Sequence, residues 1–282
     1  MLIAIPSSGR YDCNQQVTLR NFISMESKRH VVLCVPETER RRYNSNVFAE
    51  VIGRPIRLTV ANVPASHSGI SYTREWILTE LAAQHKERYV MMLDDDMDFS
   101  YRPDMSSPAL ETIKDPKLFE SMFVLLEQWL AEGFIHVGLS ARQRNNYCST
   151  AYCDATRMMN AYAYDVDALQ ALGVDIGRNL VMHDFDLTLQ LLRKGYPNRV
   201  SYQYVWNQRG SNALGGCSSY RTAKVQKASA LQLKEDHPDF VTVVTKTANS
   251  VWKDMEERSD VNVQWKKALS DGQRNRSRLF VC

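Results

Sequence analysis

Three consecutive aspartates, Asp94, Asp95 and Asp96, are the residues whose type and spacing most clearly could do chemistry. They follow the apolar run Tyr-Val-Met-Met-Leu at 89–93, which predicts a buried strand that ends in acids. Adjacent carboxylates repel one another unless a cation or a basic side chain compensates their charge. One or two carboxylates together with substrate phosphates are the usual ligands of Mg²⁺ or Mn²⁺. Because alternate residues of an extended chain point to the same side, we predict that Asp94 and Asp96 share a metal ion; the alternative is an acidic turn that binds none.

Two segments earlier in the chain could bind the phosphates of such a substrate. The first is Pro-Ser-Ser-Gly-Arg at 6–10, where small residues let the backbone approach a ligand and Arg10 could pair with a phosphate or stack on a base. The second is the predicted helix start between Gly69 and Arg74, since a helix N-terminus offers free N–H groups to an anion. Each also fits a plainer role, as an ordinary loop or a surface arginine. The sequence has neither Gly-x-Gly-x-x-Gly nor a Walker lysine, which excludes the usual dinucleotide and P-loop sites.

A later segment, His-Asp-Phe-Asp at 183–186, supplies candidate acid–base groups. Asp184 either caps the helix that follows or acts as a general base that removes a proton from a hydroxyl group. His183 fits three roles: a metal ligand, a second base, or a hydrogen-bonded wall of the site.

The elements that must position these residues alternate between strand and helix over the first two hundred residues. This alternation predicts a mainly parallel sheet with helices on both faces. In such sheets ligands bind beyond the carboxyl ends of the strands, which is where the three segments lie. The predicted strands are 2–6, 30–36, 56–60, 89–93, 135–139 and 160–164, and the predicted helices are 14–23, 70–84, 117–132 and 184–194.

The composition, with 44% hydrophobic and 24% charged residues among 282, excludes collagen-like, coiled-coil and wholly disordered chains. The apolar runs are shorter than the roughly 18–20 residues of a membrane span, so we expect no membrane contact and a cytoplasmic location. Six scattered cysteines predict reduced thiols rather than a disulfide scaffold.

Positive charge is concentrated at the C-terminal end. The formal net charge is +3, and residues 262–282 alone hold five Lys or Arg and one Asp. A tail of this kind either contacts phosphate backbones or is a solvated terminus. We expect one domain over residues 1–220 and a helical, basic extension over 221–282 that packs on it, with no obligate protein partner.

Taken in order, these segments resemble the nucleotide-sugar glycosyltransferases of the GT-A fold over about the first 200 residues. Residues 94–96 match the Asp-x-Asp motif, and the segment 183–196 resembles the family's Glu-Asp-x-Asp-Leu…Gly-Tyr helix, with His183 where Glu is more usual. The resemblance implies an α/β, GT-A-like (Rossmann-like) fold with a helical C-terminal appendage. More narrowly, Ile5–Arg10 and Leu93–Met97 are similar to the virus-encoded TET-associated glycosyltransferases, a GT-A group thought to act on hydroxymethylated pyrimidines in DNA.

The resemblance also implies a nucleoside diphosphate sugar donor, with UDP as the expected nucleotide, and Mn²⁺ or Mg²⁺ as cofactor. Asp94 and Asp96 would ligate the metal, which compensates the charge of the leaving diphosphate. In an inverting enzyme Asp184 would deprotonate the acceptor hydroxyl, and in a retaining one it would position the acceptor or the sugar. The implied donor-binding residues are Pro6, Ser7, Ser8, Arg10, Arg74, Asp94 and Asp95, and the implied catalytic residues are Asp184, His183 and Asp186.

The polar segment 140–157 is the candidate acceptor site, because arginines interleaved with aromatics can bind phosphates and stack on a base. The acceptor-binding candidates are Arg142, Arg144, Tyr147 and Tyr152. Together with the resemblance, they favour DNA that carries 5-hydroxymethylcytosine or another 5-hydroxymethylated pyrimidine over a saccharide or protein acceptor. The glycine-containing loop 206–220 could close over the donor.

Three other classes remain as alternatives. A sugar nucleotidyltransferase also uses metal-bound acids after a strand, and segment 6–10 partly matches its glycine-rich phosphate loop. A glycoside hydrolase would use paired carboxylates without a metal. A DNA-binding module without catalysis gives no reason for three acids at a strand end.

Overall fold

The apolar runs predicted as strands all enter one sheet. A computed structural model describes residues 1–142, 149–208, 220–247 and 257–279, and within them ten strands form a sheet in the order β3-β2-β1-β4-β9-β7-β10-β5-β6, with β8 also paired to β10. Neighbours β3, β2, β1 and β4 are parallel, as are β7 and β10, which confirms the predicted α/β fold with a mainly parallel sheet. The strands are β1 (Leu2–Pro6), β2 (His30–Pro36), β3 (Arg57–Val63), β4 (Tyr89–Leu93), β5 (Met97–Tyr101), β6 (Glu111–Thr112), β7 (His136–Ala141), β8 (Tyr152–Asp154), β9 (Ala161–Asp165) and β10 (Arg199–Gln208).

Two antiparallel strands decide where the acidic segment lies. Strand β9 runs antiparallel to both of its neighbours, β4 and β7, and separates them. Strand β5 begins directly after the turn at 94–96 and pairs antiparallel with β10. The three aspartates therefore stand in a tight connection between two strands of the same sheet.

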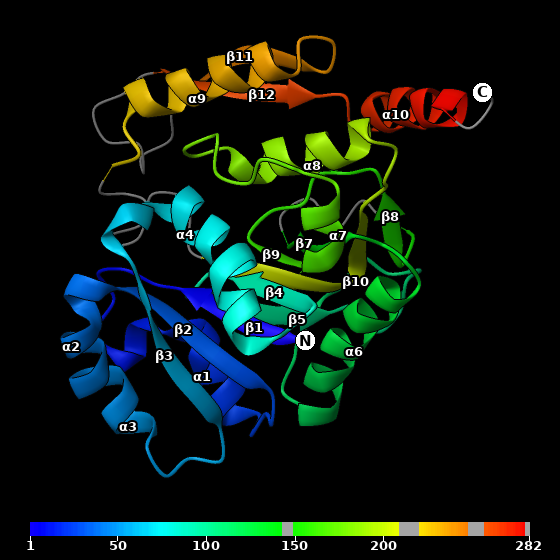
Figure 1. The fold of residues 1–282 in the computed structure, drawn as a ribbon. Coiled ribbons are helices and arrows are strands. Elements are labelled where there is room, and N and C mark those ends of the chain that lie inside the picture. Colours follow the sequence, from blue (N-terminus) through cyan, green and yellow to red (C-terminus); the bar gives the residue numbers. More distant parts are fainter. Residues whose placement is uncertain (143–148, 209–219, 248–256, 280–282) are drawn as a thin grey trace.

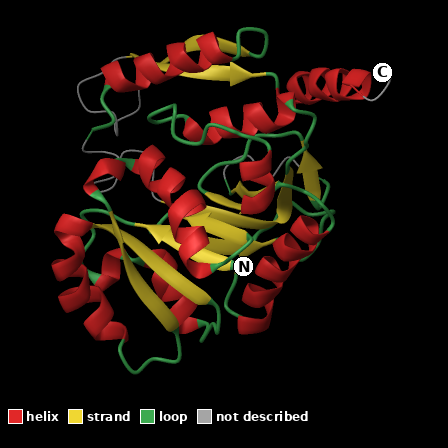
Figure 2. Cartoon of the chain, viewed as in Figure 1, coloured by secondary structure: helices red, strands yellow, loops and turns green. Residues whose placement is uncertain are grey.

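Helices cover both faces of this sheet (Figure 2). The predicted helix at 70–84 forms as α4 and α5 joined by a π-helical turn at Ile77–Leu81, and the predicted helix at 117–132 forms as α6. No helix in the described part of the chain is long and apolar enough to cross a membrane. The helices are α1 (Val17–Ser24), α2 (Arg40–Tyr43), α3 (Ala49–Val51), α4 (Ile70–Trp76), α5 (Ala82–His85), α6 (Pro116–Ala131), α7 (Val166–Ala171), α8 (His183–Arg193), α9 (Ala223–Asp236) and α10 (Trp265–Leu279).

The side chains of β1 point alternately to the two faces of the sheet, and they show why helices cover both faces. Ile3 and Ile5 belong to an apolar cluster with α1 and α6, whereas Leu2 and Ala4 belong to a second cluster with α4, α7 and α8. All four are completely buried. Since successive side chains of a strand point to opposite faces, a strand that is apolar at every position must be covered on both sides.

The C-terminal extension packs on the face of α8 that the sheet leaves free (Figure 1). A third apolar cluster joins Phe185, Leu189 and Leu192 of α8 to residues of α9, α10 and a two-stranded hairpin. The hairpin, β11 (Val241–Thr247) with antiparallel β12 (Glu257–Val263), was not predicted beside the expected helices, although six of the seven residues of β11 are Val or Thr. The predicted boundary at 220 adjoins residues 209–219, which lie outside the described chain.

Helix α10 crosses α8 at a glycine. A Cβ atom at Gly272 would meet the carbonyl oxygen of Leu192 and lie 2.7 Å from the carbonyl carbon of Arg193. Both are backbone atoms, so a side chain at this position requires the two helices to move apart.

We therefore expect Gly272→Ala to lower the free energy of unfolding by about 1–3 kcal/mol, despite the better helix propensity of alanine. Urea denaturation followed by circular dichroism measures this change. Ser270→Ala, on an exposed position of the same helix, is the control and should stay within about 0.5 kcal/mol of the original protein. An unchanged midpoint for Gly272→Ala would mean that α10 does not pack closely on α8.

Candidate active site

The segments singled out from the sequence meet at one edge of the sheet. Strands β1 and β4 are adjacent and parallel, so the segment 6–10 and the aspartates emerge side by side at their carboxyl ends. The same edge receives Arg74 from α4 and His183 from the start of α8. The structure thus brings together groups that lie up to 176 positions apart, from Ser7 to His183.

Asp95 faces inward and is held by the segment that follows β1. Its side chain is 5% exposed and accepts hydrogen bonds from the Ser7 hydroxyl and the Arg10 guanidinium. Ser7 also accepts a hydrogen bond from Gln16 Nε2 at 2.8 Å and lies 2.9 Å from the Tyr43 hydroxyl. Burial raises the pKa of Asp95 to about 7, against the opposing effects of Arg10 and Ser7. These contacts make Asp95 the anchor of the segment 6–10.

Asp94 and Asp96 are more open than Asp95, with side-chain exposures of 25% and 13%. The expectation that they face one way because the chain is extended is wrong, since residues 95 and 96 form a turn. Arg10 NH2 lies 3.1 Å from Asp96 Oδ2, and burial together with the Asp94 charge raises the pKa of Asp96 despite this arginine.

The described residues at this edge offer a metal ion at most two His, Cys, Asp or Glu side chains at a time. No group of three His, Cys, Asp or Glu side chains within the described ranges could hold a metal ion. Mg²⁺ and Mn²⁺ are often held by one or two carboxylates with a diphosphate completing the coordination. Asp94 and Asp96 are the two more open carboxylates of this turn, and their sharing of a metal ion stays a prediction. Burial is the largest cause of the raised pKa of Asp96, and a cation bound beside this carboxyl would favour its charged form.

The acidic turn is fixed by α1. Thr18 Oγ1 donates to the carbonyl oxygen of Asp94 at 2.5 Å and accepts from the Met97 N–H at 2.9 Å. The Thr18 N–H donates to the carbonyl oxygen of Asp95 at 3.1 Å. One threonine therefore holds the backbone on both sides of the aspartates.

Arg74 links the aspartates to α8. It is 4% exposed, donates to Asp94 Oδ1 at 2.5 Å and to His183 Nε2, and its guanidinium lies 5.2 Å from the centre of the Tyr162 ring. Burial, and then the charges of Arg74 and Arg221, hold the pKa of His183 well below its usual value, so the imidazole is neutral. Of the three roles open to His183, these contacts favour the hydrogen-bonded wall.

Asp184 is half-buried, directly beside His183 in the first turn of α8. Burial raises its pKa, while the positive charges of Arg74, Arg157 and Arg221 act in the opposite direction. A carboxylate with a raised pKa accepts a proton more readily, which suits a general base.

Asp186 occupies a different environment from the one predicted for a catalytic group. It is fully buried, accepts from Arg178 Nε at 2.8 Å and from Gln190 Nε2 at 2.8 Å, and lies 2.7 Å from His237 Nε2. Arg193 donates to the other ring nitrogen of His237 at 2.9 Å, which leaves Nε2 to donate to Asp186. Both oxygens are therefore engaged, and Asp186 ties α8 to the C-terminal extension.

The remaining predicted residues are more dispersed. Ser8 donates to Glu39 at 3.2 Å instead of an aspartate, and Pro6 is the buried last residue of β1. Tyr152 packs 5.8 Å from the Trp129 ring with the Arg199 guanidinium 4.1 Å from its centre, a cluster that includes none of the aspartates. Arg142 is exposed after β7, on the edge where β4 also ends. Arg144, Tyr147 and most of the loop 206–220 lie outside the described residues.

Several residues at this edge were not predicted. Thr18, Gln16 and Tyr43 are polar but far from the aspartates in sequence, and nothing local marks them. Arg157 and Arg221 act on Asp184 although neither was chosen as a candidate. Arg157 belongs to the polar segment 140–157, which was a usable signal, whereas Arg221 carried none.

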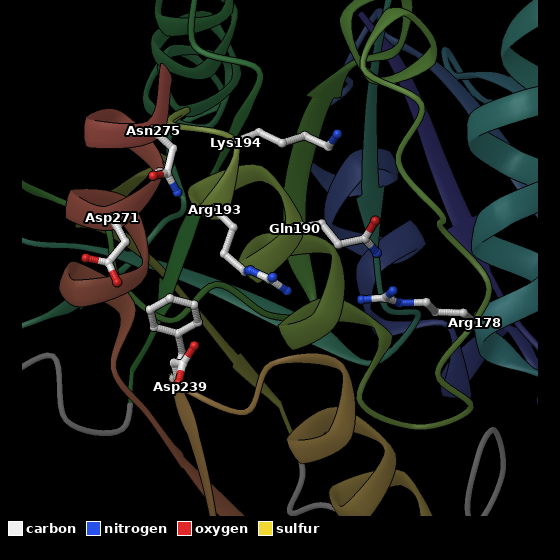
Figure 3. Close-up of a pocket in the computed structure, with 9 residues that line it drawn as sticks. Arg178, Gln190, Arg193, Lys194, Asp239, Asp271 and Asn275 are labelled. Atoms are coloured by element: carbon white, nitrogen blue, oxygen red, sulfur yellow. The ribbon is translucent and has the colours of Figure 1, made fainter. Parts of the chain in front are cut away.

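A hollow of about 400 Å³ lies at the other end of α8 (Figure 3). Its lining includes Arg178, Arg193 and Lys194 of the main domain and Asp239 and Asp271 of the extension. Arg178 and Arg193 are already bonded to Asp186 and to the carbonyl oxygen of Asp236. None of the candidate catalytic or metal-binding residues faces this hollow.

Comparison with known proteins gives one family and several distant structures. The family model described as TET-Associated Glycosyltransferase matches residues 1–216. A curated relative, the Beta-glucosyl-HMC-alpha-glucosyl-transferase of Enterobacteria phage T6, is 23% identical over 223 residues, which are 74% of this chain and 72% of the relative.

Two solved structures resemble the fold of this chain with low TM-scores. The mannosyltransferase PcManGT from Pyrobaculum calidifontis, solved with GDP-Man and Mn²⁺, has a TM-score of 0.45 and 15% identity over 70% of this chain and 53% of its own. Residues 1–349 of TarS from S. aureus have a TM-score of 0.45 and 9% identity over 83% of this chain and 65% of their own. The match thus spans between about half and two thirds of those two chains, and it carries no information on activity.

The buried network around Asp186 predicts a defined pH dependence of stability. Burial opposes ionisation of Asp186, but hydrogen bonds from His237 and Arg178 outweigh it and hold its pKa below the usual value. A carboxyl whose pKa is depressed in the folded state stabilises the fold above the unfolded pKa of about 3.9, and this contribution is lost as the pH falls below it.

Asp186→Asn should therefore lower the free energy of unfolding at pH 7 by about 3 kcal/mol, because it removes the buried carboxylate charge that pairs with Arg178 and hydrogen-bonds to His237. Below about pH 4 the difference from the original protein should shrink. Urea titrations at pH 7 and pH 3.5 measure both quantities. A pH-independent difference would show that the Asp186 charge does not contribute.

Proposed function

The chain belongs to the TET-associated glycosyltransferase family, and from this premise we propose that it transfers a sugar from a nucleoside diphosphate sugar to a hydroxyl group on a 5-hydroxymethylated pyrimidine of DNA. The observation that carries the proposal is the pair of contacts that Arg74 makes with Asp94 and with His183. Through them the aspartates expected to bind the donor lie close to Asp184, the candidate base. The phage T6 relative, whose name contains HMC, supports DNA as the acceptor. The other candidate acceptors are a saccharide and a protein.

We propose that the donor lies along the carboxyl ends of β1 and β4, with UDP as its nucleotide. The Arg10 and Arg74 guanidiniums stand at this edge and would face the anionic diphosphate. Asp94 and Asp96 would hold Mn²⁺ or Mg²⁺, which when bound compensates the charge of the departing diphosphate. Asp95, buried against Ser7 and Arg10, keeps Arg10 in place.

In an inverting transfer, Asp184 accepts the proton of the acceptor hydroxyl. The hydroxyl oxygen bonds to the anomeric carbon of the sugar, and the bond from that carbon to the diphosphate breaks. The raised pKa of Asp184 favours this proton transfer. In a retaining transfer the same carboxylate positions the acceptor. His183, neutral and hydrogen-bonded to Arg74, holds the start of α8 in either case.

The acceptor is tested by intact-mass analysis of oligonucleotides that carry cytosine, 5-hydroxymethylcytosine, 5-hydroxymethyluracil or glucosylated 5-hydroxymethylcytosine. Each is incubated with Mn²⁺ and a panel of nucleotide sugars. We expect a mass gain of one sugar only on a hydroxymethylated or glucosylated base. No mass gain on any DNA, with release of nucleoside diphosphate when a saccharide or protein is added, would contradict the DNA acceptor. The proposal of sugar transfer would then stand with a different acceptor.

The site residues are tested by variants in the same assay. Asp96→Ala and Asp94→Ala should each lower kcat by at least about 100-fold, and EDTA should abolish turnover of the original protein. Asp184→Asn should lower kcat by about 100- to 10,000-fold, the usual contribution of a general base.

Asp98→Asn is the matched control, since Asp98 is exposed two positions after Asp96 and should keep full activity. Full activity of Asp96→Ala, or resistance of the original protein to EDTA, would remove the metal from the proposal. Full activity of Asp184→Asn would remove the base.

A further inference from the structure

Two arginines that the donor chemistry does not use act on Asp184 through their positive charge. Arg157 comes from the connection between β8 and β9, and its guanidinium lies 4.7 Å from the centre of the ring of Phe185, the next residue after Asp184. Arg221 immediately precedes α9, and its Nε donates to Gln226 at 3.0 Å. The two arginines thus reach the start of α8 from separate parts of the chain.

The side chain of the residue before Arg221 contacts the helix that carries Arg74. The hydroxyl of Tyr220 accepts the Ile70 N–H at the start of α4 at 2.8 Å. This contact holds Arg221 near the site, where its charge acts on both His183 and Asp184.

Exposure orders the charges around Asp184 from the interior to the surface. Arg74 is buried, Asp184 and Arg221 are half-buried, and Arg157 is exposed. Arg157 and Arg221 are thus more open than Arg74 to an acceptor that approaches from the solvent.

Helix α9 continues this positive surface. Its buried face consists of Gln226, Ser229, Ala230 and Leu233, so that Lys224 and Lys227 are exposed on the opposite face. The sequence contains no acidic residue from Arg221 to Lys234. Lys224 and Lys227 therefore have no acidic neighbour within this stretch of the sequence. We refer to Arg157, Arg221, Lys224 and Lys227 together as the basic track.

The basic residues of α10 are a weaker candidate for the same ligand. Lys267 donates to the carbonyl oxygen of Asp239 at 3.1 Å, Arg274 pairs with Asp271, and the Arg276 guanidinium lies 4.3 Å from the centre of the Tyr196 ring. None of these three side chains is among the charges that act on Asp184, whereas Arg157 and Arg221 are.

We propose that Arg157 and Arg221 bind the phosphodiester groups on either side of the acceptor nucleotide, and that Lys224 and Lys227 extend this contact along the strand. The inference rests on the proposed DNA acceptor. A base that presents its hydroxymethyl group to Asp184 must leave the stack, and it brings its own two phosphates to the mouth of the site. Arginine suits this ligand because its planar fork pairs with phosphate oxygens. Contacts of this kind position the strand without reading its sequence.

The test compares oligonucleotides with ordinary phosphates and with neutral methylphosphonates at the two linkages that flank the hydroxymethylated base. Arg157→Gln, Arg221→Gln and the double variant are assayed for kcat and KM on both. With ordinary DNA each single variant should raise KM about 5- to 10-fold. The plot of log(kcat/KM) against log[salt] should become shallower by about 0.7–0.9 for each arginine that is replaced.

With the methylphosphonate DNA, the original protein and the double variant should have the same KM, because the phosphate charges that the arginines bind are absent. Additive losses from the variant and the methylphosphonate would overturn the inference. Lys224→Gln, at an exposed position on the same track, should raise KM without affecting the melting temperature. Lys266→Gln on α10 removes one charge elsewhere and should change neither KM nor the salt slope.

The inference and the proposed function fail in different ways. If the original protein modifies DNA but the arginine variants match it in KM and salt slope, the phosphate contacts are wrong and the DNA acceptor stands. If the original protein modifies no DNA, the acceptor proposal fails and this inference fails with it.

Discussion

The arrangement of the candidate site depends on one buried guanidinium. A buried charge is costly unless it is paired and hydrogen-bonded, and Arg74 meets this condition between Asp94, after β4, and His183, at the start of α8. The Tyr162 ring of β9 lies against the same guanidinium. Elements that are distant in sequence are therefore held at fixed separation, and Asp184 stands next to the acidic turn because its neighbour His183 is bound to Arg74.

A second buried charge secures α8 from its outer side. Asp186 is bonded to Arg178 and Gln190 near α8 and to His237 of the C-terminal extension. The family model ends at residue 216, so His237 lies beyond the part of the chain that defines the family. The extension nevertheless supports the helix that begins with His183 and Asp184, both through this charge and through the apolar contacts of Leu189 and Leu192.

The electrostatics of the edge divide the carboxylates into two groups. Asp95 and Asp186 are buried, and each holds an arginine, so their function is to position other groups. Asp94, Asp96 and Asp184 keep part of their surface open and are the carboxylates that a ligand can reach. Their negative charge is balanced on the inside by Arg10 and Arg74, and Arg157 and Arg221 add positive charge beside Asp184.

The sequence by itself determined the strands β1, β2 and β4, the long helix α6 and the edge at which the chemistry occurs. The strands and the helix could be predicted because the spacing of apolar residues is a local property of the sequence. The edge could be predicted because parallel strands have their carboxyl ends on the same side of the sheet. It left the turn at 95–96 as one of two alternatives, and it did not reveal the inward position of Asp95, the structural pairing of Asp186 or the place of Arg221. Only the tertiary structure decided these. The partner of a charged side chain is chosen by burial among elements far apart in the chain, as for Asp186 and His237, and no local pattern records that choice.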